Sequence, residues 1–264
     1  MVIRRASIIV DGLCIVLEFY LPEVRGREIH PTVCLCHGIP GRVKDPTDRG
    51  YQLLAERFCN EGFAVLIFNF RGTGESDGNF DILGWTRDLS AVTDFLLNQP
   101  GVDKERISLM GFSGGAAVSV YVTAHDHRIR SLVTCACPSE FSIISDPERR
   151  DLFIEQAKMV GIIRDENYPP SINEWMKGFE DVSPIKWVDM VSPRPLLIIH
   201  GTGDDTVDIS HARKLYEKAK NPKEILLIEG AEHGIRTDER AINSALQWLK
   251  KVNVMSLDTR QRHL

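Results

Sequence analysis

The stretch that decides the fold is ISLMGFSGGAAVSVYVTA, residues 107–124. A largely apolar run ends at Gly111, small residues with helical spacing follow almost at once, and Ser113 lies between glycines. The pattern G-x-S-x-G between a buried strand and a helix is typical of a nucleophile elbow, a sharp turn that holds a reactive serine above the edge of a sheet. The alternative is a glycine-rich turn with an incidental serine. The two interpretations differ in whether a histidine and a carboxylate follow later strands of the chain.

Apolar runs recur along the chain, with helical patterns between them. Continuous runs of Val, Ile and Leu indicate strands buried on both faces, as in a parallel sheet between helices. The sequence therefore predicts an α/β fold with a mostly parallel, twisted sheet and helices on both faces. The predicted strands cover residues 32–38, 64–72, 106–113, 130–138, 195–201 and 224–233, and the predicted helices cover 48–61, 85–98, 114–125, 209–219 and 238–251.

Two segments depart from this rhythm. Residues 7–20, SIIVDGLCIVLEFY, predict an antiparallel hairpin, because Asp-Gly suits the positive φ angles of a two-residue turn. A stretch of roughly fifty residues before the strand at 195 is too long for a bare loop in a compact domain. We therefore expect one domain over residues 1–264, with residues 139–190 forming a small helical insertion that acts as a lid.

Charge and composition exclude several classes of function. The net charge is −5, with 32 Lys and Arg against 37 Asp and Glu, so we expect neither nucleic acid nor a membrane surface as a partner. No apolar run is long enough for a transmembrane helix, and the amino-terminal arginines are not followed by a signal-peptide pattern. The six cysteines do not match zinc spacings, which predicts buried, reduced thiols in a cytoplasmic protein.

Nothing in the sequence indicates a cofactor. No G-x-G-x-x-G follows the first parallel strand and no P-loop occurs, so we expect no nucleotide, and the chemistry proposed below needs no metal. The expected partner is a small-molecule acyl ester. Assembly of identical chains is left open.

A serine hydroxyl needs a base that accepts its proton and a carboxylate that orients the base. In this architecture the chain order is Ser, then Asp or Glu, then His, each after a strand. His233 follows the last predicted strand and Asp204 follows the strand before it. Asp205 and Asp208 are rivals for the carboxylate, and Asp204 is the preferred one.

The oxyanion formed during acyl transfer needs backbone N–H donors. One is expected from Gly114, the residue after the serine, at the start of a helix. The other is expected from residues 37–41, HGIPG, where Pro40 has no N–H; we choose Ile39 and hold Gly41 in reserve. His37 is expected to give a supporting hydrogen bond rather than to transfer a proton.

Together these motifs resemble the α/β-hydrolase superfamily of serine hydrolases, over nearly the whole chain. GFSGGA matches the nucleophile elbow and HGIPG resembles the family's oxyanion loop. FNFRGTGESDGNF (68–80) is similar to a segment of small carboxylesterases of the feruloyl or cinnamoyl kind and of acylaminoacyl-peptidase-like hydrolases. SPRPLLIIHGTGDDTVD (192–208) and GAEHG (230–234) resemble the loops of the acid and the histidine. The sequence departs from the family at Asp208, where proline is usual.

The resemblance implies a carboxylesterase with Ser113 as nucleophile, His233 as base, Asp204 as acid, and Ile39 and Gly114 as oxyanion donors. Amides, thioesters and carbon–carbon bonds are alternative targets of the same triad, and a binding protein on a hydrolase fold is the alternative from another class. Arg71, Asp77 and Trp85 are expected to be structural. The insertion also carries large apolar residues, which we expect first to pack it onto the main domain and second to line a substrate pocket: Phe153, Met159, Tyr168, Trp175, Met176, Phe179 and Trp187.

Overall fold

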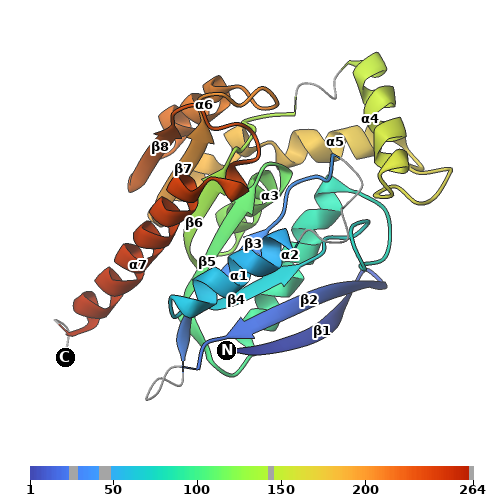
Figure 1. Cartoon of the computed structure of the whole chain (residues 1–264). Coiled ribbons are helices and arrows are strands. Elements are labelled where there is room, and N and C mark those ends of the chain that lie inside the picture. Colours follow the sequence, from blue (N-terminus) through green and yellow to red (C-terminus); the bar gives the residue numbers. More distant parts are fainter. Residues whose placement is uncertain (24–28, 42–48, 142–145, 262–264) are drawn as a thin grey trace.

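The centre of the molecule is an eight-stranded sheet with the strand order β1-β2-β4-β3-β5-β6-β7-β8 (Figure 1). The computed structural model describes residues 1–23, 29–41, 49–141 and 146–261, of which 254–261 are described by their backbone alone. Strands β3 to β8 pair in parallel with one another, whereas β2 pairs antiparallel with both β1 and β4. The predicted fold class is confirmed.

The strands that carry the site alternate their side chains between two apolar layers. In β3, Cys34 and Cys36 belong to one buried cluster, and Val33 and Leu35 belong to the other. This is the period of two that a strand buried on both faces requires. The strands are β1 (Val2–Val10), β2 (Leu13–Leu21), β3 (His30–Cys36), β4 (Ala64–Phe68), β5 (Val102–Phe112), β6 (Ile129–Cys135), β7 (Leu196–Gly201) and β8 (Lys223–Ile228).

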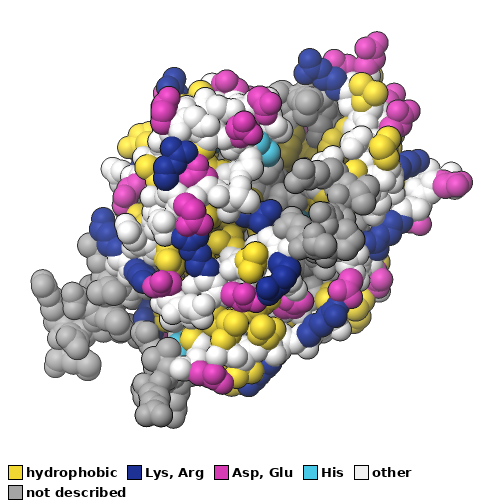
Figure 2. Space-filling model, in the orientation of Figure 1, with side chains coloured by type: hydrophobic (Ala, Val, Ile, Leu, Met, Phe, Trp, Pro, Cys, Tyr) yellow, Lys and Arg dark blue, Asp and Glu magenta, His cyan; other side chains and the backbone are white. Residues whose placement is uncertain are grey.

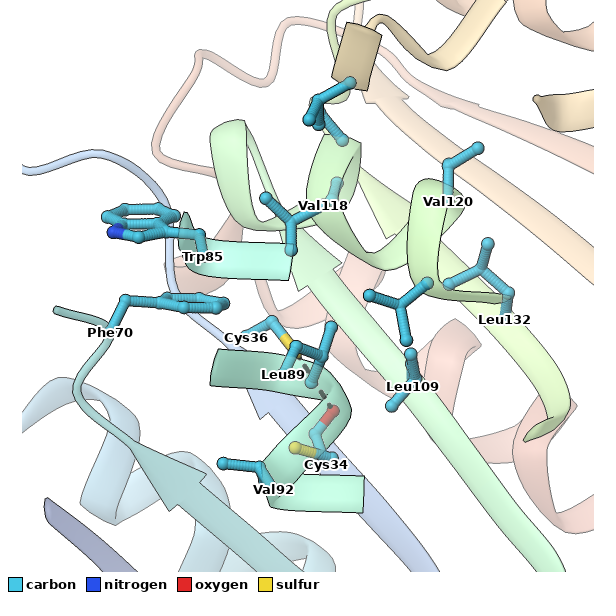
Figure 3. Close-up of a cluster of buried hydrophobic side chains, with 14 of the residues drawn as sticks. Cys34, Cys36, Phe70, Trp85, Leu89, Val92, Leu109, Val118, Val120 and Leu132 are labelled. Carbon is cyan, nitrogen blue, oxygen red and sulfur yellow. Dashed lines mark hydrogen bonds between the residues drawn. The ribbon is translucent and has the colours of Figure 1, made fainter. Parts of the chain in front are cut away.

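Helices cover both faces of the sheet. Apolar residues of α2 (Ile82–Leu97), α3 (Gly114–His125) and α6 (Ile209–Lys218) join one buried cluster, and those of α1 (Gly50–Asn60) and α7 (Glu239–Gln261) join the other. Figure 3 shows the first cluster, where Trp85 and Leu89 of α2 and Val118 of α3 surround Cys36 of β3. The sheet is therefore covered by packed helices on both of its faces.

The amino-terminal hairpin turns as predicted. Val10 pairs with Leu13, and the two residues between them, Asp11 and Gly12, have φ angles of 51° and 80°. A two-residue turn of this kind matches the twist of the strands. Ion pairs of the buried Arg71 connect the hairpin to the domain, because Arg71 contacts both the exposed Asp11 of the turn at 2.9 Å and the buried Asp88 at 2.7 Å.

Residues 139–190 contain α4 (Pro147–Met159), α5 (Ile172–Val182) and two short 3₁₀ helices, η2 (Pro184–Lys186) and η3 (Val188–Met190). Phe80 lies at the centre of their packing, since its ring is 5.7 Å from that of Phe153, 6.2 Å from that of Trp175 and 5.8 Å from that of Phe179. The Trp175 indole also donates to the Phe80 carbonyl at 3.2 Å. These aromatic residues thus pack the insertion onto the main domain, whereas Met159 remains 73% exposed.

Several predicted boundaries were wrong, for identifiable reasons. The strand expected to reach residue 233 ends at Ile228, because the chain turns at Gly230, whose φ is 69°. The helix expected from 85 begins at Ile82, where the Asp81 side chain accepts from the Leu83 amide at 3.1 Å and caps the helix. The strand expected over 64–72 ends at Phe68, and the segment after it forms turns.

Candidate active site

Ser113 occupies a strained turn between β5 and α3. Its φ of 50° and ψ of −122° lie outside the regions that side-chain-bearing residues normally adopt. The glycines around it are required sterically: a Cβ on Gly111 would lie 2.5 Å from the Ala116 Cα, and one on Gly115 would lie 2.1 Å from the His37 carbonyl oxygen. The Ser113 amide donates to the Cys135 carbonyl at 2.9 Å, which ties the turn to the end of β6.

His233 lies against the serine hydroxyl. Its Nε2 is 3.1 Å from Ser113 Oγ, although the two residues are 120 positions apart in the sequence. The loop that carries His233 is attached to the loop after β7, because the Gly203 amide donates to the Ala231 carbonyl at 3.0 Å and the Gly230 amide donates to Thr202 Oγ1 at 2.8 Å. Two loops from neighbouring strands thus hold the imidazole in place.

Asp204 lies behind the imidazole. Its Oδ2 and Oδ1 are 2.9 and 3.1 Å from His233 Nδ1, and Oδ1 also accepts from the amides of Thr206 at 3.0 Å and Val207 at 2.8 Å. Burial works against ionisation of this carboxyl, but the hydrogen bonds from His233 and from the two amides outweigh it and hold the pKa of Asp204 below its ordinary value. Asp204 therefore carries a negative charge near neutral pH.

The two rival carboxylates are engaged elsewhere. Asp205 is exposed and accepts from the Thr206 hydroxyl at 3.2 Å. Asp208 accepts from the Ser210 amide at 2.8 Å and caps α6. This capping role accounts for an aspartate at the position where the family usually has proline, since aspartate is a favourable N-cap residue. Among the three carboxylates, the structure brings Asp204 to His233.

The segment 37–41 lies directly against the serine turn. A Cβ on Gly38 would be 3.0 Å from the Ser113 Cβ, and one on Gly114 would be 2.7 Å from Ile39 Cγ1 and 3.6 Å from the Ile39 nitrogen. Ile39 therefore packs against Gly114, the residue that follows the serine, and Gly38 packs against Ser113 itself. The reserve residue, Gly41, has its carbonyl bound by Gln156 Nε2 of α4 at 3.1 Å.

His37 holds this segment through both ring nitrogens. The Phe70 amide donates to Nε2 at 3.3 Å, which leaves the proton on Nδ1, and Nδ1 lies 2.8 Å from the Gly38 carbonyl oxygen. The carbonyl of Gly38 and the amide of Ile39 belong to one planar peptide, so a contact that holds the first also orients the second. His37 therefore has the supporting position expected from the sequence.

The surface of the molecule carries a depression. Figure 2 shows a depression between the α6 side of the molecule and helices α4 and α5, with hydrophobic side chains visible inside it.

Over the described part of the chain, no group of three or more His, Cys, Asp or Glu side chains is arranged to hold a metal ion. The six cysteines are free thiols, and all but Cys14 are buried. Within the same ranges, no helix is both long and apolar enough to cross a bilayer.

Comparison with known proteins identifies the family. A model of the prolyl oligopeptidase family matches residues 50–254. The chain belongs to this family. At 28% identity it aligns over 84% of its length with the uncharacterized protein PA2218 of Pseudomonas aeruginosa, of which it covers 72%, and it covers 62% of the length of two further curated relatives.

Solved structures share the fold of this prolyl oligopeptidase family member. The crystal structure of PA2218 matches with a TM-score of 0.74 at 22% identity, over 95% of this chain and 93% of that one. The α/β hydrolase GrgF from Penicillium sp. sh18 gives 0.74 at 19% identity, over 95% and 99%. Est1E from Butyrivibrio proteoclasticus, with ferulic acid bound, gives 0.70 at 20% identity, over 96% and 99%. These structures and the family match show that the chain has the α/β-hydrolase fold.

Two residues near the site were not singled out by sequence reasoning. Tyr51 of α1 lies 6.1 Å from the His37 ring and 5.6 Å from that of Phe112, and burial raises the pKa of its phenol. No sequence signal places it there, because the position of α1 depends on packing. His200, the penultimate residue of β7, has its Nε2 3.4 Å from Asp204 Oδ2. Its spacing of four residues from Asp204 was the available signal.

Proposed function

We propose that this family member is a serine hydrolase that cleaves carboxylic esters through an acyl-enzyme intermediate. The observation that carries the proposal is the continuous line of contacts from Ser113 Oγ through the His233 imidazole to the Asp204 carboxylate, at 3.1 and 2.9 Å. Nucleophile, base and orienting acid are within hydrogen-bond reach of one another, which is the arrangement that acyl transfer by a serine requires.

In the acylation half of the reaction, Ser113 Oγ attacks the carbonyl carbon of the ester while His233 Nε2 takes the hydroxyl proton. Asp204 accepts from Nδ1 and stabilises the resulting imidazolium. The tetrahedral intermediate then collapses: the bond to the alcohol oxygen breaks, and that oxygen receives the proton from Nε2. In the second half, Nε2 takes a proton from water, the hydroxide attacks the acyl carbon, and the proton returns to Ser113 as the acid leaves.

The oxyanion is proposed to bind between the amides of Ile39 and Gly114. The packing of Ile39 against Gly114 and the position of Gly114 as the first residue of α3 support this assignment, since a helix N-terminus favours negative charge. The substrate is proposed to enter through the hollow between α6 and helices α4 and α5, which would serve as a lid (Figure 2).

Amide cleavage is the second candidate, because the family whose model matches is named for oligopeptidases. We place ester cleavage first for a chemical reason: an alcohol is a better leaving group than an amine, so a triad that cleaves an amide also cleaves the matched ester. Free thiols at all six cysteines support a cytoplasmic location, which is likewise part of the proposal.

The test compares matched p-nitrophenyl acyl esters and p-nitroanilides on the wild type and on Ser113→Ala. We expect ester turnover and labelling by a fluorophosphonate probe in the wild type, and a loss of at least about 10⁴-fold in kcat/KM with no labelling in the variant. A circular dichroism spectrum establishes that the variant is folded. Undiminished ester turnover by Ser113→Ala would remove the proposal, and a higher kcat/KM for the anilide would favour the peptidase alternative.

A further inference from the structure

His200 is a fully buried histidine at the end of β7 with no part in the mechanism described so far. It is 0% exposed, and its Nε2 lies 2.8 Å from the Val207 carbonyl oxygen and 3.4 Å from Asp204 Oδ2. Because a carbonyl can only accept, Nε2 carries the proton and donates it to Val207. Its Nδ1 has no hydrogen-bond partner among the described residues.

Val207 is held from both sides of its backbone. Its carbonyl accepts from His200, and its amide donates to Asp204 Oδ1 at 2.8 Å. The loop from Asp204 to Val207 is therefore fixed at one end by the imidazole of His200 and closed on itself by the carboxylate of Asp204. With Oδ1 engaged by backbone amides, Oδ2 is the oxygen that lies nearest to His233 Nδ1, at 2.9 Å.

The anchor itself is rigid. His200 pairs with Leu227 of β8, and the next residue, Gly201, fits so closely that a Cβ on it would lie 2.1 Å from the Ala231 carbonyl oxygen. The His233 loop is attached to the same strand end through the Gly203 amide. The His200 ring thus projects from a fixed backbone, so its contact with Val207 defines where the acid loop lies relative to His233.

We propose that His200 is a positioning residue for the acid of the triad: by holding the Val207 carbonyl it fixes the loop that directs the Asp204 carboxylate at His233. This inference rests on the proposed function and adds to it the residue that sets the geometry of its acid. His200 touches neither the serine nor the reacting atoms, so it acts through Val207 and Asp204.

A change at His200 should affect proton transfer and not substrate binding. A carboxylate that turns away from His233 stabilises the imidazolium less, so kcat falls while KM is unchanged. The imidazole then also loses its proton more readily, so the acidic side of the pH profile of kcat/KM moves to lower pH. Apart from Asp204, the titratable groups whose charges interact with His200 within the described ranges include Asp208 and His211.

The test is a matched pair of variants. His200→Gln keeps an N–H near the position of Nε2, whereas His200→Asn is equally polar but too short to reach the Val207 carbonyl. We expect His200→Gln to retain the wild-type kcat, and His200→Asn to lose about 10- to 100-fold in kcat with an unchanged KM and a displaced acidic limb. Equal kcat values for the two variants, a change confined to KM, or a uniform loss at every pH would overturn the proposal.

A second measurement is independent of activity. We expect the proton between His233 Nδ1 and Asp204 to give a far-downfield proton NMR signal that persists in His200→Gln and in Ser113→Ala and weakens or shifts upfield in His200→Asn. If His200→Asn does not fold, His200→Gln becomes the test. Loss of the downfield signal or of the wild-type kcat in His200→Gln then overturns the inference. Turnover that survives in Ser113→Ala would instead contradict the proposed function, while the NMR signal would still report whether His200 positions Asp204.

Discussion

Replacing Gly115 by alanine tests how the oxyanion segment is held against the serine turn. Gly115 lies in the first turn of α3, and a Cβ at this position would lie 2.1 Å from the His37 carbonyl oxygen and 2.6 Å from that of Cys36. Both obstacles are backbone atoms at the end of β3, so no flexible side chain can move away. The new methyl group must push α3 and the segment 36–39 apart.

The size of the effect follows from these distances. Relieving the closest contact requires a displacement of about 1 Å between α3 and the β3 end. Overpacking of this kind costs about 1–3 kcal/mol, and the better helix propensity of alanine offsets about 1 kcal/mol of that. A net loss of about 1 kcal/mol lowers Tm by about 2–4 °C. The effect on catalysis is larger, because a 1 Å misplacement of the Ile39 amide costs about 100-fold in kcat.

The assay measures kcat on a p-nitrophenyl ester and Tm by calorimetry, with Gly178→Ala as the matched control. Gly178 also lies inside a helix, but a Cβ there would meet the Leu83 Cβ at 3.2 Å, which requires a shift of only a few tenths of an ångström between α5 and the start of α2. We expect wild-type kcat in the control and the 100-fold loss in Gly115→Ala. A Gly115→Ala enzyme with wild-type kcat would refute the reasoning that close backbone packing places the oxyanion donors.

Three further predictions concern stability, each measured by urea titration. Arg71→Met removes the cationic partner of the buried Asp88 carboxylate and leaves only the backbone amide of residue 71, among the described residues, to donate to it, so the free energy of unfolding falls by about 3–5 kcal/mol; the double variant with Asp88→Leu should recover most of this, and a loss as large in the double variant would contradict it. Phe80→Ala removes the ring at the centre of the packing of the insertion and should cost about 3–5 kcal/mol; a cost below 1 kcal/mol would mean that the insertion packs independently of it. Because the folded-state pKa of Asp204 is lowered, its ionisation contributes stability that is present above its ordinary value of 3.8 and is lost as the pH falls through the lowered value. Asp204→Asn lacks this pH-dependent contribution. The difference in free energy of unfolding, wild type minus variant, should therefore decrease as the pH falls below about 4. A difference that does not change with pH would contradict this prediction.

Local requirements explain why much of the fold could be predicted. Asp11 and Gly12 form the hairpin turn because both adopt positive φ angles. Gly111 and Gly115, within five residues of chain, leave the space that the strained turn at Ser113 needs. The apolar runs that predicted strands are found in the sheet, because a strand buried on both faces has to be apolar throughout. Boundaries were predicted less well where a side chain such as Asp81 caps a helix earlier than its apolar pattern begins.

By itself, the sequence determined the order of strands and helices, the turn that carries Ser113 and the two loops that carry an acid and a histidine, because each depends on neighbours a few residues away. The resemblance favoured Asp204 among three nearby aspartates, but only the tertiary structure shows which of them meets His233 and that His200 lies behind it. Asp204, Asp205 and Asp208 carry the same side chain within five residues of one another. They differ only after β7 and β8 pair and their loops exchange hydrogen bonds, because that pairing buries one carboxylate against the imidazole and leaves the others to solvent or to a helix cap.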